Sequence, residues 1–380
     1  MGFMAHTFDI CIRGSGIVGK TLALLLARDR LKVALVPAPL SATPHATDVR
    51  AYAINASSRA LLESLRSWPD EAHATAVKQM HVDGDQGGSV VFDAQRHGVD
   101  ALAWIVDVPA LESRLSEAVR FQPHIELTDA PVDATLTVVC EGRASSTRAE
   151  LGVNFTITPY AQQAIATRVR CEHSHGQVAR QWLSPAGILA FLPLDGPLGK
   201  TVAVVWSLPE EQAAHTRALP PENFCQALQQ ASHHTLGALE LCAERAAWPL
   251  QLAKADRWCG SSSADAKSPR SWVLAGDAAH NVHPLAGQGL NLGLADAQAL
   301  AEVLHHRDYW RSVSDLRLLR RYERERKVAL MAMGFATDSL QQVFARHEAP
   351  WQTLRNWGMK GFERSGPFKA FITRQAMGMN

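Results

Sequence analysis

The sequence predicts an α/β protein in which a parallel-sheet domain, built from separate segments, is interrupted by an inserted antiparallel sheet and followed by C-terminal helices. Three observations support this fold class. A strand–turn–helix–strand unit occupies residues 8–36, short alternating apolar runs fill 155–207, and a second strand–turn–helix unit occupies 271–304. Because strand–turn–helix units typically build parallel sheets, their separation indicates a discontinuous, Rossmann-like domain.

Composition limits the class of protein. A chain of 380 residues can hold two domains, and 47% hydrophobic with 20% charged residues is typical of a globular protein. A formal net charge of +1 argues against a basic nucleic-acid-binding protein. The six cysteines form no CxxC pair, so neither structural zinc nor disulfides are expected. With no secretory signal and no apolar run of about 20 residues, we expect a cytoplasmic protein.

The first unit contains a strand at 8–13, a helix at 17–29 and a strand at 32–36. Its turn carries Gly14, Gly16 and Gly19, the spacing of a dinucleotide-binding fingerprint. Glycines allow close approach of the backbone, and the helix N-terminus favours the negative charge of a pyrophosphate. A glycine-rich turn without a ligand is the alternative.

The second strand of this unit lacks the acidic residue that usually holds an adenosine ribose. Pro37 stands at that position, and no acid follows before Asp48. The ribose is therefore held by other groups, or the site is weak.

The elements expected next are a helix capped by Ser57 or Ser58, a hairpin over 80–94, a helix over 109–119, a strand over 135–142 and the β-type runs of the insertion. We expect the parallel-sheet domain to comprise 1–75, 99–153 and 256–315, the inserted domain 76–98 and 154–255, and the C-terminal helices 316–380. Trp182 and Phe191 of the insertion could line an aromatic pocket, but such residues on a sheet are more often core.

Residues 271–304 contain the more informative motif. A buried strand at 272–275 leads into Gly276-Asp277, and a loop ending in Gly287-Gln288-Gly289 precedes a helix from about 290 to 304. The carboxylate therefore stands at a strand's end, where ligands bind in open α/β sheets. A second helix N-terminus can stabilise developing negative charge. His280 and His283 have H-x-x-H spacing, but no third ligand stands nearby, so we expect no metal.

Together the two units resemble the flavin-dependent aromatic hydroxylases of the para-hydroxybenzoate hydroxylase fold, and within them the branch that hydroxylates ubiquinone precursors. GDAAHNVHPLAGQGLNLGLAD, at 276–296, is similar to the flavin signature of that branch. Shorter matches are VRAYAIN around Arg50, YAQQAI, FLPL, VVWS and the ending PFKAFITRQAMG. The resemblance therefore covers nearly the whole chain.

The resemblance implies FAD as cofactor, NAD(P)H as transient reductant and a small aromatic substrate, whose phenolic ring receives oxygen from O₂ through a flavin hydroperoxide. The residues that it implies for the cofactor are Gly14, Gly16 and Gly19 at the pyrophosphate, Arg50 near the cofactor, Asp277 at the ribityl or pyrophosphate portion, Gly287, Gln288 and Gly289 beneath the flavin pyrimidine, and Asn291. It singles out no catalytic side chain, because the cofactor performs the chemistry.

The chain departs from the family on the adenosine and pyrophosphate side. The family carries an ADG motif where this chain has Cys140-Glu141-Gly142, and Pro37 replaces the expected acid. These changes favour a second interpretation, a non-catalytic accessory subunit of a biosynthetic complex, whereas the intact segment 276–293 favours the enzyme. A flavoprotein that reduces a double bond is a third interpretation, against which the FLPL and VVWS matches argue.

The last segment, 346–380, interleaves basic and aromatic residues. Such a segment can lie on an anionic bilayer or pack on the protein with a solvated outer face. We favour the packed helix. The alternative places the protein peripherally at the inner face of the membrane.

Overall fold

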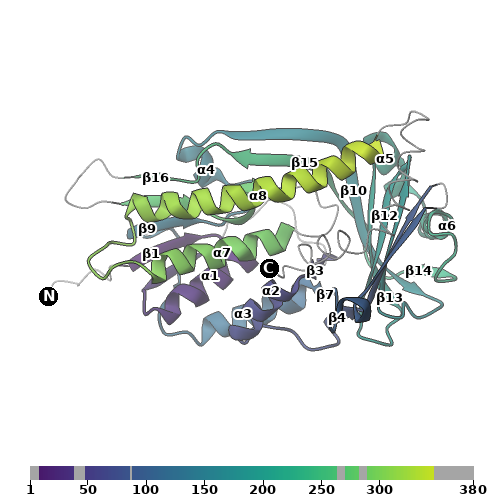
Figure 1. The fold of residues 1–380 in the computed structure, drawn as a ribbon, viewed down its shortest axis with the longest axis horizontal. Coiled ribbons are helices and arrows are strands. Elements are labelled where there is room, and N and C mark those ends of the chain that lie inside the picture. Colours follow the sequence, from purple (N-terminus) through teal and green to yellow (C-terminus); the bar gives the residue numbers. More distant parts are fainter. Residues whose placement is uncertain (1–7, 38–47, 86–87, 263–269, 282–288, 346–380) are drawn as a thin grey trace.

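The structure, a computed structural model, describes residues 8–37, 48–85, 88–262, 270–281 and 289–345, with side chains up to residue 331. Figure 1 shows a parallel sheet with its helices on the left and a larger sheet on the right. The predicted mixed α/β architecture is confirmed, including the helix α8 (Leu316–Ala345) after the last strand.

The first sheet has β1 (Phe8–Arg13) at its centre. The order across the sheet is β16 (Cys259–Ser261), β17 (Ser271–Leu274), β9 (Ala134–Val139), β1, β2 (Val33–Val36) and β8 (Ile125–Leu127). All neighbours are parallel except β16 and β17. The sheet therefore combines segments from distant parts of the chain, as the sequence predicts.

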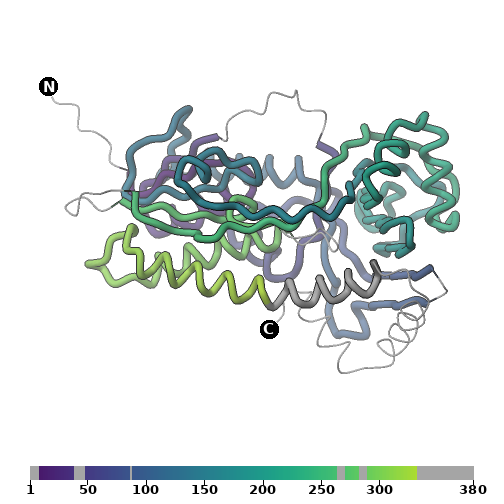
Figure 2. The backbone as a smooth tube through the Cα atoms, turned by 90° about the horizontal axis from the view of Figure 1, so that it is seen from above, coloured from purple at the N-terminus to yellow at the C-terminus, as the bar shows by residue number. Residues whose placement is uncertain are grey.

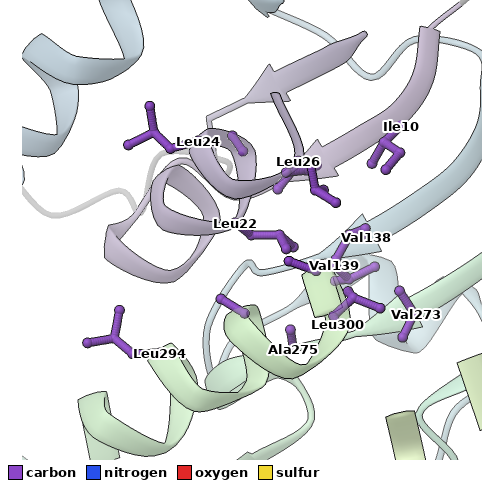
Figure 3. Close-up of a cluster of buried hydrophobic side chains, with 14 of the residues drawn as sticks. Ile10, Leu22, Leu24, Leu26, Val138, Val139, Val273, Ala275, Leu294 and Leu300 are labelled. Carbon is purple, nitrogen blue, oxygen red and sulfur yellow. The ribbon is translucent and has the colours of Figure 1, made fainter. Parts of the chain in front are cut away.

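Helices α1 (Ile17–Arg28) and α7 (Gly289–His305) pack beside this sheet, α3 (Val108–Arg120) packs against α1, and α8 runs along α7 (Figure 1). Figure 3 shows where α1 meets the sheet and α7, with Leu22, Val138 and Leu300 converging. Leu22 is fully buried. Burial of such a side chain contributes roughly 1.5–3 kcal/mol, so this junction is held mainly by apolar contact.

The second sheet is almost entirely antiparallel. Its order is β18 (His280–Asn281), β15 (Ala246–Ala255), β10 (Phe155–Cys171), β13 (Thr201–Pro209), β12 (Gly187–Pro193), β11 (Val178–Ser184), β5 (Gln79–Gly84) and β6 (Ser89–Asp93), with β14 (Leu239–Leu241) also on β10. The exception is the parallel pair of β5 and β11. The expected hairpin, β5 and β6, thus extends the sheet from an earlier part of the chain.

The two sheets are connected by long strands. In Figure 2, β10 and β15 run side by side from one part of the molecule to the other. The short strand β18 follows the Gly276-Asp277 turn and pairs with β15. That turn therefore lies where the two sheets meet.

The remaining elements are the three-stranded sheet of β3 (Ala51–Ile54), β7 (Ala103–Asp107) and β4 (Ala74–Val77), the helices α2 (Ala56–Ser64), α4 (Ser146–Glu150), α5 (Glu210–Ala218) and α6 (Pro221–Ala231), and the 3₁₀ turns η1 (Gln95–His97) and η2 (Gly276–Ala278). The expected cap of α2 is wrong. Asn55 is the N-cap, and its side chain accepts the Ser58 N–H at 2.8 Å. Asn is as good a cap as Ser, and it lies nearer the end of β3.

Trp182 and Phe191 belong to the core of the second sheet. Both are buried, and their rings meet edge to face with centroids 5.0 Å apart. The core interpretation of these two residues is confirmed.

Candidate active site

Three parallel strands deliver their carboxyl ends to one edge of the first sheet. Gly14 follows β1, Cys140-Glu141 follows β9, and Gly276-Asp277 follows β17, and these strands are neighbours in register. The two glycine turns, about 260 residues apart in the sequence, therefore meet in space. This edge is where ligands bind in open α/β sheets.

Two glycines of the first turn are required by the protein itself. Gly14 has φ +113°, and a Cβ on it would lie 2.3 Å from the Cys140 carbonyl oxygen. A Cβ on Gly19 would lie 1.9 Å from the Gly14 carbonyl oxygen. These glycines let α1 approach β1 and β9 closely, whatever the turn binds.

Gly16 and Gly289 have no such reason to be glycine. A Cβ at either position would meet no atom of the described residues within 4 Å. Gly16 is also the N-cap of α1 and offers no side-chain bond to the first-turn N–H groups. A Cβ at either glycine would point into open space at the start of α1 or α7, so the described residues leave room there for the pyrophosphate and flavin portions of FAD.

Asp277 is exposed at this edge. The dense protein around it raises the pKa of its carboxyl despite that exposure, while His280, Arg143 and Arg50 act in the opposite direction. Arg50 is already paired, since its Nε and Nη2 donate to the Asp48 carboxylate at 2.8 and 2.5 Å. This hydrogen bond to Asp48 raises the pKa of the Arg50 guanidinium. The Asp277 carboxylate therefore stands at this edge within electrostatic range of Arg50, whose guanidinium is paired with Asp48.

Asn291 is engaged with the protein. Its Nδ2 donates to the Ala53 carbonyl at 2.8 Å, and its Oδ1 accepts the Asn55 N–H at 3.0 Å. The side chain thus ties the start of α7 to β3 and α2. Gly287 and Gln288 lie outside the described residues.

Glu141 points into the protein. Its buried carboxylate accepts hydrogen bonds from the Ser145 hydroxyl at 2.7 Å and the Thr147 hydroxyl at 2.6 Å, and it lies 3.1 Å from the Arg13 Nε. The longer side chain that replaces the aspartate of the family motif is thus satisfied by the end of β1 and the start of α4. The sequence flagged this substitution but gave no sign of its three partners.

A residue that sequence reasoning missed lies beneath the turn. Asp296 of α7 is fully buried, and its Oδ2 accepts the Gly276 N–H at 2.9 Å and lies 2.6 Å from the His280 Nε2. Asp296 is the last residue of the 276–296 signature, and that position was the available signal. The partner of His280 is thus a carboxylate, and the described part of the chain holds no cluster suited to a metal ion.

Comparison with known proteins agrees with this geometry. Residues 93–335 match the family described as FAD binding domain. The chain is 30% identical to a ubiquinone hydroxylase of Rhodospirillum rubrum over 97% of this chain and 89% of that protein. It is 29% identical to the 3-demethoxyubiquinol 3-hydroxylase of Escherichia coli over 98% of both.

Solved structures share the fold. A probable FAD-dependent monooxygenase from Pseudomonas aeruginosa superposes with a TM-score of 0.73 at 21% identity, over 94% of this chain and 100% of that chain. A p-nitrophenol 4-monooxygenase from Pseudomonas putida gives 0.72 at 16% identity, over 98% and 96%. These structures have the same discontinuous α/β arrangement.

Proposed function

The chain belongs to the FAD binding domain family, and from that membership we propose that it is an FAD-dependent monooxygenase that hydroxylates the phenolic ring of a ubiquinone precursor. NAD(P)H is the reductant and O₂ the source of oxygen. A polyprenylated precursor is the substrate that we propose. When bound, FAD supplies the electron transfer and oxygen chemistry of this reaction.

The observation that carries the proposal is the meeting of the two glycine turns at one edge of the sheet. The turn at 14–19 provides N–H groups for a pyrophosphate, and Asp277 provides an acceptor for a ribityl or pyrophosphate-side hydroxyl. The start of α7 at Gly289 would stabilise negative charge on the flavin ring, because it exposes N–H groups and the positive end of the helix dipole. Relatives that span nearly the whole chain are named as ubiquinone hydroxylases, which supports the substrate class.

The accessory-subunit interpretation is not supported by these relatives. Glu141, the substitution that favoured this interpretation in the sequence, has its carboxylate satisfied inside the protein. Pro37 remains the departure that bears on the adenosine ribose. Restoring an acid there, Pro37→Glu, should tighten FAD binding if the ribose site is weak.

We also propose peripheral attachment to the inner face of the membrane through residues 346–380, which lie outside the described residues, and membership of a biosynthetic complex. In the described part of the chain, no helix is both long and apolar enough to cross a membrane.

The test is turnover by the FAD-loaded protein with NADH or NADPH and candidate prenylated phenols. We expect oxidation of the reductant that depends on the phenol, and a product heavier by one oxygen atom in mass spectrometry. Asp277→Ala is the matched control and should lower both signals when FAD is limiting. Oxidation of NADH or NADPH without a hydroxylated product from any phenol of this class would contradict the proposed substrate.

A further inference from the structure

Two side chains from outside the turn hold the turn that carries Asp277: Arg148 donates to the Ala278 carbonyl at 3.0 Å, and Asp296 accepts the Gly276 N–H. Gly276 has φ +63°, and its N–H donates to the Asp296 carboxylate at 2.9 Å. Asp296 comes from α7, 20 residues further along the chain. The backbone immediately before Asp277 is thus fixed by an acceptor outside its own loop.

Both oxygens of this buried carboxylate are used. Oδ2 takes the Gly276 N–H and lies 2.6 Å from the His280 Nε2, while Oδ1 takes the Arg326 Nε–H of α8 at 2.6 Å. Arg326 and His280 are themselves nearly buried, with side chains 11% and 5% exposed. A carboxylate this deep is stable only when its charge is compensated and its oxygens are hydrogen-bonded.

Five parts of the fold meet around this network. His280 stacks on Trp258 with centroids 5.0 Å apart, and its backbone pairs with Lys254 of β15. A Cβ on Gly293 of α7 would lie 2.7 Å from Val18 Cγ2 and 3.6 Å from the Gly276 Cα. The turn, α1, α7 and β15 are therefore in close contact around Asp296, and α8 joins them through Arg326.

We propose that Asp296 is a positioning residue of the flavin site: its carboxylate fixes the Gly276 backbone and so places Asp277, and Arg326 of α8 provides the compensating charge. This inference rests on the proposed function, because it assumes that Asp277 contacts FAD. It also assigns α8 a role at the site, through the bond from Arg326 to Asp296.

The test is Asp296→Asn, which keeps the size of the side chain but has one acceptor oxygen. That oxygen can accept from the Gly276 N–H or from the Arg326 Nε–H. The NH₂ group of the asparagine then faces the other donor and cannot accept a hydrogen bond from it. We expect the variant to bind FAD roughly tenfold more weakly or worse, the effect of losing one charged hydrogen bond. Flavin fluorescence gives the affinity, and the visible band shape of the bound flavin should change as well.

Glu323→Gln is the matched control. Glu323 also anchors α8, through the backbone N–H of Trp258 and the Cys259 thiol near β16. It reaches the turn only indirectly, through the Trp258 ring that stacks on His280, and it is not the acceptor of the Gly276 N–H. Both variants should melt at a lower temperature than the wild type. At a temperature where both are folded, only Asp296→Asn should lose FAD affinity and alter the flavin spectrum.

Three results would overturn the inference. Asp296→Asn could bind FAD within twofold of the wild type, or Glu323→Gln could lose as much affinity. If Asp296→Asn does not fold, Arg326→Lys takes its place, because it keeps the charge but loses the Nε geometry. Unchanged affinity in Arg326→Lys would then contradict the inference. A wild-type protein that binds no FAD would instead contradict the proposed function itself.

Discussion

Asp277 is the carboxylate that the second glycine turn delivers to the edge of the parallel sheet. Because the Asp277 side chain is exposed and forms no hydrogen bond or ion pair within the described part of the chain, Asp277→Ala should leave the melting temperature of the apoprotein within a few degrees. FAD affinity should fall roughly 10- to 100-fold, the effect of removing one charged hydrogen-bond acceptor. Calorimetric titration of the folded variant checks this. Full retention of FAD affinity would show that Asp277 does not contact FAD.

Glu141 shows how a departure from a family motif can be accommodated. Its carboxylate spans Arg13, Ser145 and Thr147, and a side chain one methylene shorter cannot reach all three. Glu141→Asp, although it restores the family's residue, should destabilise the protein by about 1–3 kcal/mol because it leaves buried donors unpaired. Chemical denaturation measures this. A more stable Asp variant would mean that the loop before α4 can rearrange.

At the scale of elements, two glycines of the first turn have different expected roles: Gly14 is needed for packing, and Gly16 for ligand binding. Gly14→Ala forces a Cβ onto the Cys140 carbonyl at a positive φ, so it should destabilise the fold by several kcal/mol. Gly16→Ala meets open space in the described structure and should leave the melting temperature nearly unchanged, yet it should weaken FAD binding. Thermal melts and FAD titrations of the two variants make the comparison. Equal FAD affinity in Gly16→Ala and wild type would place the pyrophosphate elsewhere.

The elements themselves could be read largely from the sequence. The strand at 8–13 and the helix that follows it were predicted to within one residue, because apolar periodicity and glycine punctuation are local signals. The Asn55 cap, the parallel pairing of β5 with β11 and the partners of Glu141 were not predicted. Each depends on which of several suitable residues the tertiary fold brings close, and no local pattern records that choice.

On the scale of the whole molecule, the buried ion pairs of Asp296 predict that the protein is less stable in acid. Burial alone would raise the pKa of Asp296, but the neighbouring His280 and Arg326 outweigh it, so the pKa lies below its ordinary value. Because the pKa of Asp296 is lowered by folding, the ion pairs of Asp296 stabilise the protein fully above the pKa of an unfolded aspartate, about 4. This stabilisation is lost as the pH falls below that pKa. The apoprotein should therefore melt at progressively lower temperature as the pH drops from about 5 to 3. Asp296→Asn should be less stable at neutral pH and show a smaller decline. An identical decline in both proteins would assign the acid sensitivity to other carboxylates.

The central claim is that two turns distant in the sequence form one FAD site. The most direct measurement is the visible absorption spectrum of the purified protein during titration with FAD. We predict saturation at one FAD per chain, with the structured flavin bands of a bound isoalloxazine. A protein that stays colourless after removal of excess FAD, while remaining folded, would contradict the claim.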